Sequence, residues 1–152
     1  MEIRHATDKD IPDVVTLNVD QENNWRHFEE GKGFTEDAPY TELSPYERYK
    51  HGGPWLDNQF MDYQFNLYKQ CEGTIILAYE NDKLVGEADL TISNEPKPYE
   101  RSMNLVWILV DYRHRGKGIA KALLRKAVAY GKQNNCRFFF TWPEDERSDG
   151  LY

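Results

Sequence analysis

One stretch in the C-terminal half of the chain constrains the fold more than any other. A strongly apolar run meets a basic loop with two glycines, and the residues after Gly118 repeat apolar side chains at helical spacing. Gly131 and the pair Asn134-Asn135 are residues that commonly end a helix, and a second apolar run follows them. The pattern predicts a strand buried on both faces, a helix and a second strand parallel to the first. The predicted bounds are 103–112 for the first strand, 118–130 for the helix and 136–142 for the second strand.

The upstream sequence adds further elements in an order typical of a mixed α/β domain. Thr7 and Asp10 have the spacing of a capping box, which predicts the start of a helix. The other expected elements are a strand at 3–6, a helix at 10–24, a loop at 31–44, a helix beginning at Ser44-Pro45, a helix at 56–70 and a hairpin of 74–79 with 83–93. On the second hairpin strand, simple alternation places Leu84, Gly86, Ala88, Leu90 and Ile92 on one face and Val85, Glu87, Asp89 and Thr91 on the other. At 152 residues the chain suits one α/β domain with a mixed central sheet flanked by helices.

The loop between the parallel strand and its helix has the chemistry of an anion site. Gly116 and Gly118, with the small Ala120, allow a tight turn and a close approach of a ligand to the backbone. The helix start exposes unpaired N–H groups at the positive end of its dipole, which favours phosphate. Arg113, Arg115 and Lys117 add positive charge around it. The loop lacks the Walker A pattern and the G-x-G-x-x-G fingerprint, so it is neither of those nucleotide sites.

Residues Arg113-His-Arg-Gly116-Lys-Gly118-Ile-Ala120 resemble the Q/R-x-x-G-x-G/A motif of the GNAT superfamily of N-acetyltransferases. The order of the predicted elements resembles that family over most of the chain. The resemblance implies acetyl-CoA as cosubstrate and direct transfer of its acetyl group to a primary amine in a ternary complex. It also implies that residues 101–142 form the cofactor-binding βαβ unit. In that unit the backbone at Ile108 and Val110 would pair with the pantetheine arm. The pyrophosphate would be held by the backbone N–H groups of Arg115, Gly116, Lys117, Gly118, Ile119 and Ala120.

Acetyl transfer to an amine also needs a base and an acid for the leaving thiolate. Glu87 and Asp89 lie on one face of their strand and are the base candidates, although a solvated sheet face is an alternative explanation for them. Glu100, in a loop with Pro96 and Pro98, is a weaker option. The strand at 103–112 lacks the internal Glu that some family members use, so a base acting through water stays open. Tyr152 is the acid candidate, because Leu151-Tyr152 resembles the family's tyrosine stretch; a frayed chain end is the alternative for Tyr152.

Charge is distributed unevenly along the chain. Residues 20–72 carry eleven acidic and five basic side chains and eleven of the 21 aromatic ones, whereas residues 101–152 carry ten basic and five acidic ones. The basic half suits an anionic cofactor. By resemblance the acidic, aromatic region would lie over the acceptor side, where it would favour a cationic amine through charge and cation–π contact. Its alternative is an amphipathic cap with a buried aromatic side. Trp25, Tyr49 and Trp55 have no assigned role.

Other classes of function fit the sequence less well. The four histidines show no metal-binding spacing, so no metal is expected. The net charge of −7 argues against a nucleic-acid partner, and no apolar run approaches the length of a membrane span. We therefore expect a cytoplasmic protein with a small or peptidic amine partner, with a homodimer left open. The alternative is a non-catalytic acyl-CoA-binding or regulatory module of a longer protein. Against the family pattern the closing strands after Tyr152 are missing, so we expect an incomplete domain.

Overall fold

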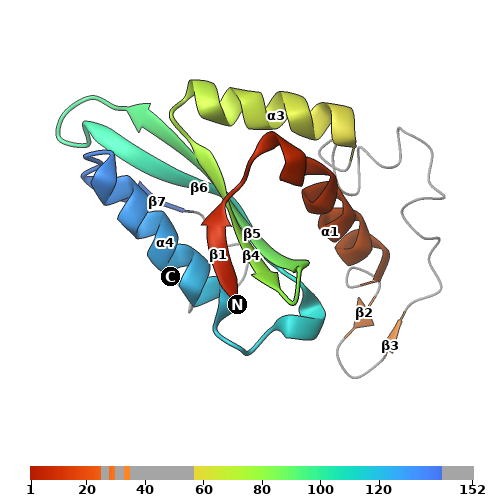
Figure 1. The fold of residues 1–152 in the computed structure, drawn as a ribbon. Helices are drawn as coiled ribbons and strands as arrows, with labels where there is room; N and C mark the ends of the chain where they lie inside the picture. Colours follow the sequence, from red (N-terminus) through yellow and green to blue (C-terminus); the bar gives the residue numbers. More distant parts are fainter. Residues whose placement is uncertain (25–27, 30–32, 35–56, 142–152) are drawn as a thin grey trace.

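The computed structural model describes residues 1–24, 28–29, 33–34 and 57–141, and within them a five-stranded mixed sheet forms the centre (Figure 1). Its strand order is β1-β4-β5-β6-β7, antiparallel throughout except for the parallel pair of β6 and β7. The strands are β1 (Glu2–His5), β4 (Thr74–Glu80), β5 (Lys83–Asn94), β6 (Arg101–Val110) and β7 (Phe138–Phe140). A separate small hairpin pairs β2 (Phe28–Glu29) with β3 (Gly33–Phe34). The prediction of a loop over 31–44 is therefore wrong for Gly33 and Phe34, which form β3.

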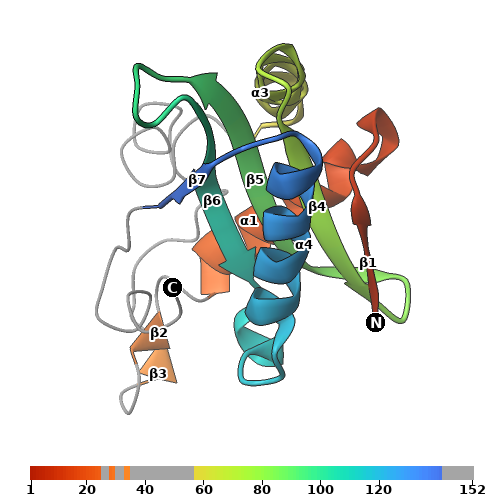
Figure 2. The ribbon, with the colours of Figure 1, turned by 90° about the vertical axis from the view of Figure 1, so that its left-hand side faces the viewer.

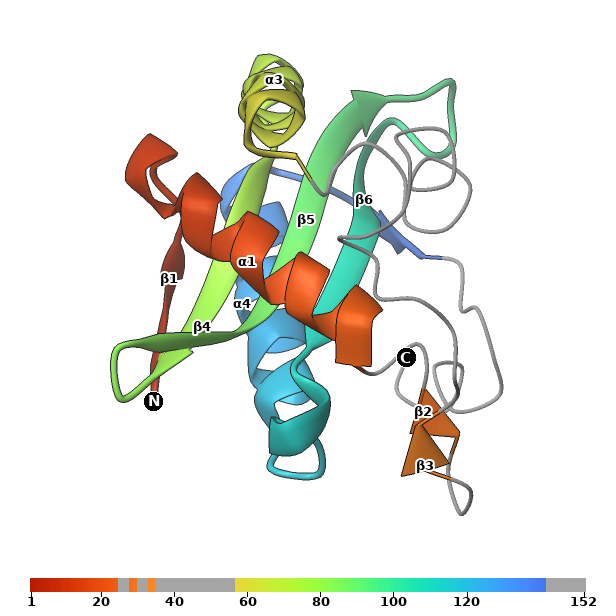
Figure 3. The same cartoon turned by 90° about the vertical axis from the view of Figure 1, so that its right-hand side faces the viewer.

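Three helices cover the two faces of the sheet. α1 (Ile11–Asn24) and α3 (Asn58–Gln70) lie on one face, and α4 (Ile119–Gln133) lies on the other, as Figures 2 and 3 show from opposite sides. Each layer closes over its own core of buried apolar side chains. Short 3-10 turns, η1 (Asp8–Asp10) and η4 (Tyr112–His114), precede α1 and α4. The predicted order of elements and the α/β class are confirmed in the described residues. The expected helix start at Ser44-Pro45 lies outside them.

The predicted capping residues do start the first helical segment. Asp10 Oδ2 accepts a hydrogen bond from the Thr7 backbone N–H at 2.7 Å. Both oxygens of Asp10 also accept hydrogen bonds from Arg4, at 2.7 and 2.8 Å. The capping residue therefore fastens α1 to β1 as well, which the local spacing alone does not indicate.

A β-bulge in β5 overturns the simple alternation expected for that strand. Tyr79 pairs with Leu84 and Ala78 pairs with Gly86, so Val85 has no opposite residue on β4. The extra residue shifts the pleat by one position. Val85 consequently joins the core under α4, and Leu84 joins the core under α1 and α3. The sequence-based faces were wrong for these two residues.

The second half of β6 is less covered than expected. β7 pairs only with residues 102–104 of β6, so within the described residues no strand follows the β7 side of β6 from Leu105 to Val110. A bulge places Val106 opposite no residue of β5, and 48% of its surface is exposed. The expectation of burial on both faces is therefore wrong for this half. Among the described residues, the backbone groups on this edge of β6 beyond Asn104 have no strand partner.

The end of α4 follows one of the two predicted signals. The helix runs past Gly131 and ends at Asn134, and Asn135 takes the left-handed conformation with φ of 60°. Gly131 is buried, and a Cβ there would lie 3.0 Å from the Cε atom of Met103. Gly131 therefore serves close packing of α4 on β6 instead of ending the helix.

Candidate functional site

A glycine-lined turn connects the open end of β6 to α4. Gly116 and Gly118 have φ values of 78° and 83°, in the left-handed region that a residue with a Cβ adopts at a cost. A Cβ built at either position would meet no atom within 4 Å, so backbone conformation and not crowding requires glycine here. The same open space leaves the backbone of the turn accessible to a ligand.

The N-terminus of α4 opens into this turn. Gly118 is the N-cap residue and offers no side chain to the N–H groups of the first helical turn. Gly116, Lys117 and Gly118 are exposed, whereas Ile119 is buried against the sheet and anchors the helix. Uncapped N–H groups at the positive end of a helix are a suitable cradle for phosphate. The structure therefore brings residues 115–120 together in one turn.

The two β6 residues predicted to contact a cofactor lie on the part of that strand beyond its pairing with β7. Ile108 packs its side chain partly into the core under α4, and Val110 is buried in that core. Only their backbone groups are thus available on the open side of the strand. Arg115 Nε donates a hydrogen bond to the Val110 carbonyl oxygen at 3.2 Å, which folds the loop back towards the strand end.

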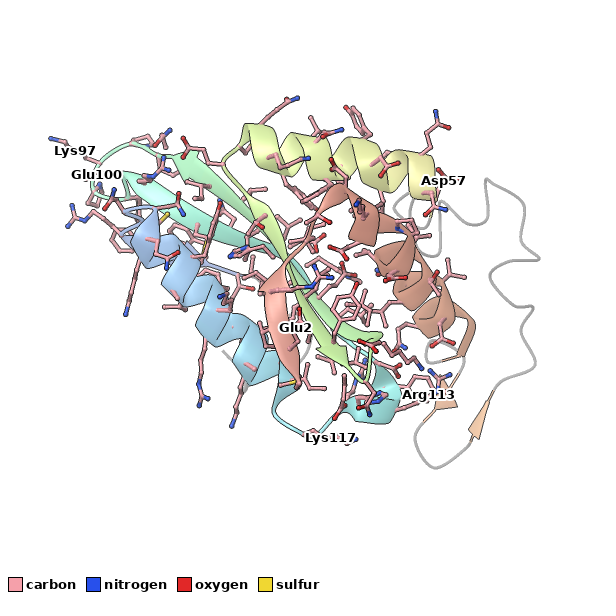
Figure 4. The ribbon with its side chains drawn as sticks, in the orientation of Figure 1. Glu2, Asp57, Lys97, Glu100, Arg113 and Lys117 are labelled. Atoms are coloured by element: carbon pink, nitrogen blue, oxygen red, sulfur yellow. The ribbon has the colours of Figure 1, made fainter. Side chains whose placement is uncertain are left out.

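Arg113 points in a different direction from the one that the anion-site interpretation expects. Its guanidinium forms an ion pair with Asp20 of α1, at 2.6 Å from Nη1 to Oδ2 and 3.3 Å from Nη2 to Oδ1. It also stacks over the Tyr112 ring, with Cζ 4.3 Å from the ring centroid. Figure 4 shows Arg113 beside the end of α1 and Lys117 on the outer side of the loop.

Glu87 and Asp89 are buried between β5 and the helices of one face. Their residue surfaces are 0% and 3% exposed, so their interpretation as a solvated sheet face is wrong. The reason lies in the tertiary structure, because α1 and α3 both cover this side of β5. Asn18 of α1 donates a hydrogen bond to Glu87 Oε1, and the Tyr68 hydroxyl of α3 donates one to Asp89 Oδ2 at 2.9 Å.

Burial alters the protonation of both carboxyl groups. Burial raises the pKa of Glu87 well above its ordinary value, and the neighbouring Asp89 charge raises that pKa further. Burial also raises the pKa of Asp89, from 3.8 to about 6, although hydrogen bonds from Glu87 and Tyr68 oppose this. Two adjacent buried carboxyls share protons as a pair. The pair therefore releases its protons at higher pH than two exposed carboxyls would.

Three polar atoms near this pair lack a hydrogen bond of ordinary geometry among the described residues. They are Glu87 Oε2, Asp89 Oδ1 and Trp107 Nε1, and Trp107 pairs with Asp89 across β5 and β6. A proton shared between Glu87 and Asp89 would give Glu87 Oε2 and Asp89 Oδ1 a hydrogen bond to each other. An indole N–H beside carboxyl oxygens also matches the donor and acceptors that a buried water needs.

Sequence reasoning missed several residues that shape the site. Asp111 is fully buried, accepts a hydrogen bond from the Arg113 backbone N–H at 2.9 Å and begins η4. An Asp directly after an apolar strand and before a helical turn is an N-cap signal that could have identified it. Asn18 and Gln21 are buried polar residues on α1, and their interruption of its apolar face was a second available signal. Tyr68 looked like one more aromatic core residue.

The remaining predictions concern four residues that the structure does not describe, a metal site and a membrane span. Tyr152 lies outside the described residues, so its role as an acid stays a prediction. Trp25, Tyr49 and Trp55, which have no assigned role, also lie outside them. Within the described part of the chain, no three His, Cys, Asp or Glu side chains converge as a metal site would require. None of the described helices combines the length and apolar character of a membrane span.

Comparison with known proteins adds an independent line of observation. A family model described as "Acetyltransferase (GNAT) family" matches residues 36–152. Human N-acetyltransferase 8B is 29% identical over 77 residues, which make up 51% of this chain and 34% of that protein. The chain thus matches about a third of the length of this curated relative.

Solved structures with low sequence identity share the fold. A ribosomal-protein-alanine N-acetyltransferase from Brucella melitensis has a TM-score of 0.65 and 18% identity, covering 99% of this chain and 86% of that one. A "predicted acetyltransferase with acetyl-CoA" from Clostridium acetobutylicum has a TM-score of 0.67 and 18% identity, covering 99% and 85%. An aminoglycoside acetyltransferase from a soil metagenomic sample has a TM-score of 0.65 and 16% identity, covering 99% and 87%.

Proposed function

The chain belongs to the acetyltransferase (GNAT) family, and on that premise we propose that it transfers an acetyl group from acetyl-CoA to a primary amine. The observation that carries the proposal is the glycine turn at the α4 N-terminus, which follows the half of β6 that β7 does not pair with in the described part of the chain. An anion cradle next to an unpaired strand edge suits a ligand with a pyrophosphate at one end and amide groups along its arm. Acetyl-CoA has that arrangement.

Each part of the cofactor has a proposed partner in this chain. The backbone N–H groups of residues 115–120 bind the pyrophosphate, and the exposed Lys117 adds positive charge outside the turn. The backbone of Ile108 and Val110 pairs with the pantetheine amides along the open side of β6. This placement brings the thioester to the end of β6, where a backbone N–H near Val110 stabilises the carbonyl oxygen as negative charge develops.

The chemical step needs one proton to leave the amine and one to reach the sulfur. The ammonium form of the acceptor first releases one proton to solvent water. The neutral amine nitrogen then attacks the thioester carbonyl carbon, a C–N bond forms, and the C–S bond breaks to release the CoA thiolate. The amine proton passes through water to Asp89. Burial raises the pKa of this carboxyl, which makes it a better base, and the hydrogen bond from Tyr68 fixes its orientation. Glu87 keeps its own proton and holds Asp89 in place. Tyr152 is the proposed acid that protonates the thiolate.

We propose as acceptor a cationic amine, carried by a small molecule or a peptide. This proposal rests on the acidic and aromatic composition of residues 20–72, which begin in the last turns of α1 and include α3. The other candidate function is a non-catalytic acyl-CoA-binding module of a longer protein. It is favoured by the short match to the curated relative, which spans 34% of that protein.

An acceptor screen separates the two functions. Purified protein is incubated with acetyl-CoA and a panel of polyamines, aminoglycosides and peptide N-termini, and release of the CoA thiol is followed. Transfer predicts thiol release that depends on one class of amine and falls about 10²–10⁴-fold in Asp89→Asn, the range expected for loss of a general base. Calorimetric binding of acetyl-CoA with no thiol release for any amine identifies the module instead. Absence of binding refutes both.

A further inference from the structure

We propose that Arg113 is a positioning residue that, together with Asp20, Gln21 and Asp111, clamps the cofactor loop to α1. The sequence motif places Arg113 among the residues around the anion. In the structure, however, its side chain binds Asp20 of α1. The inference rests on the proposed function, because it concerns the loop that binds acetyl-CoA. It adds that the cofactor loop and the helix leading to the acceptor-side region are held as one unit.

The ion pair at the centre of the clamp has the geometry of a strong contact. Both terminal nitrogens of Arg113 bind Asp20, one to each carboxylate oxygen, at 2.6 and 3.3 Å. Such two-point contacts fix orientation as well as distance. The hydrogen bond to Asp20 raises the pKa of Arg113, so the charge is secure. The two side chains are 39% and 35% exposed, where a simple ion pair contributes little. Additional contacts must therefore supply the rigidity.

Those additional contacts come from two buried polar residues. Gln21 is 5% exposed, and its Oε1 accepts a hydrogen bond from the Tyr112 backbone N–H at 3.0 Å. Asp111 is 0% exposed, and its backbone N–H donates to the Val85 carbonyl at 2.8 Å. Its Oδ1 accepts from the Arg113 N–H at 2.9 Å and lies 3.4 Å from Nη1. The start of the loop is thereby tied to β5 and to two consecutive residues of α1.

The direction of the Arg113 side chain distinguishes positioning from direct binding. The guanidinium faces α1 and, with Asp20 and Asp111, lines a cavity of about 390 Å³ between α1 and the β4–β5 turn. Lys117, four residues later, is the exposed cation on the outer side of the glycine turn (Figure 4). If Arg113 bound the cofactor phosphates, Asp20 would compete for it. In the clamp, by contrast, the ion pair between Asp20 and Arg113 holds the loop in place, so removing either residue loosens the loop.

This difference gives opposite expectations for Asp20→Asn. Acetyl-CoA affinity is measured by calorimetry for Asp20→Asn, Arg113→Gln and the double variant, and kcat and KM are measured with the acceptor found in the screen. The clamp predicts that each single variant weakens acetyl-CoA binding by about three- to tenfold, and that the double variant is no weaker than either, as for a coupled pair. We expect kcat at saturating acetyl-CoA to stay within about twofold, because no reacting group is lost.

The matched control removes a carboxylate from another exposed ion pair. Asp8 bonds Lys69 Nζ at 2.9 Å, far from the loop in sequence, and Asp8→Asn is expected to leave binding unchanged. Amide hydrogen exchange provides a readout independent of ligand. Residues 112–117 should exchange faster in Asp20→Asn and Arg113→Gln but not in Asp8→Asn.

Each contrary result has a definite meaning. Binding that is unchanged or tighter in Asp20→Asn and weaker in Arg113→Gln overturns the clamp, because Arg113 then contacts the cofactor itself. Exchange in residues 112–117 that does not respond to Asp20→Asn overturns it as well. If the unaltered protein binds no acetyl-CoA, the proposed function fails, and the exchange data still decide whether the clamp exists.

Discussion

Replacing Asp89 with Asn should make the protein more stable at alkaline pH and less active. Asp89 is 3% exposed, and its ionisation at neutral pH is unfavourable because burial raises its pKa from 3.8 to about 6. Asn has nearly the same shape, keeps an oxygen for the Tyr68 hydroxyl and stays neutral. The substitution therefore removes a buried charge with little change in packing. It also removes the proposed base.

The size of the stability effect follows from the pKa. A group whose pKa rises on folding binds more protons in the folded state, so its contribution to stability is complete below pH 3.8 and is lost as pH rises through about 6. At about 1.4 kcal/mol per pH unit, the change from 3.8 to about 6 corresponds to about 3 kcal/mol. The free energy of unfolding of Asp89→Asn minus that of the unaltered protein should rise by about 2.5 kcal/mol between pH 4 and pH 8, because part of the effect has already appeared by pH 4.

Urea denaturation at pH 4, 5, 6, 7 and 8 measures this difference directly. Asp62→Asn is the matched control, because Asp62 lies on the exposed side of the same α3 that carries Tyr68. Because its side chain is exposed, Asp62→Asn should change the free energy of unfolding by less than about 0.5 kcal/mol. A flat curve for Asp89→Asn, within about 0.5 kcal/mol, would show that Asp89 does not carry a strained buried charge. If the curve rises and Asp89→Asn still transfers acetyl groups at the full rate, Asp89 is not the base. Its raised pKa as a buried carboxyl would still be supported.

Three other substitutions test the fold around the site. Gly118→Val should weaken acetyl-CoA binding in calorimetry and lower the unfolding free energy by about 1–2 kcal/mol, because φ is 83° there; unchanged affinity would contradict the cradle. Gly86→Val should cost about 1–3 kcal/mol in urea denaturation, since even a Cβ would lie 3.1 Å from two α4 side chains. A hydrogen bond from Arg4 holds the pKa of Asp10 below its ordinary value, so this group adds stability above pH 3.8 that is lost in acid. Asp10→Asn should therefore lower Tm at pH 6 and show a smaller further loss towards pH 2, and parallel Tm curves would argue against this pair.

The helical and strand segments around the glycine turn were predictable because their signals are local. The apolar run of β6, the left-handed glycines and the periodicity of α4 each occupy a short window of sequence. The capping residues of α1 and the β4–β5 hairpin were found in the same way. The proposed cofactor cradle is also local, because it consists of consecutive backbone groups of residues 115–120.

The rest of the site depends on contacts between residues far apart in the chain. Alternation along β5 groups Glu87 with Asp89 but cannot indicate that α1 and α3 bury them, because Asn18 and Tyr68 are 69 and 21 residues away from their partners. The bulge at Val85 follows from pairing with β4, and the direction of Arg113 follows from Asp20, 93 residues away. Sequence by itself thus predicted the glycine turn and the helix start that form the proposed anion cradle, since backbone dihedrals and helix ends are local. Tertiary structure alone decided which carboxyls lose their water and which arginine is occupied, because desolvation and ion pairing depend on what packs across the sheet.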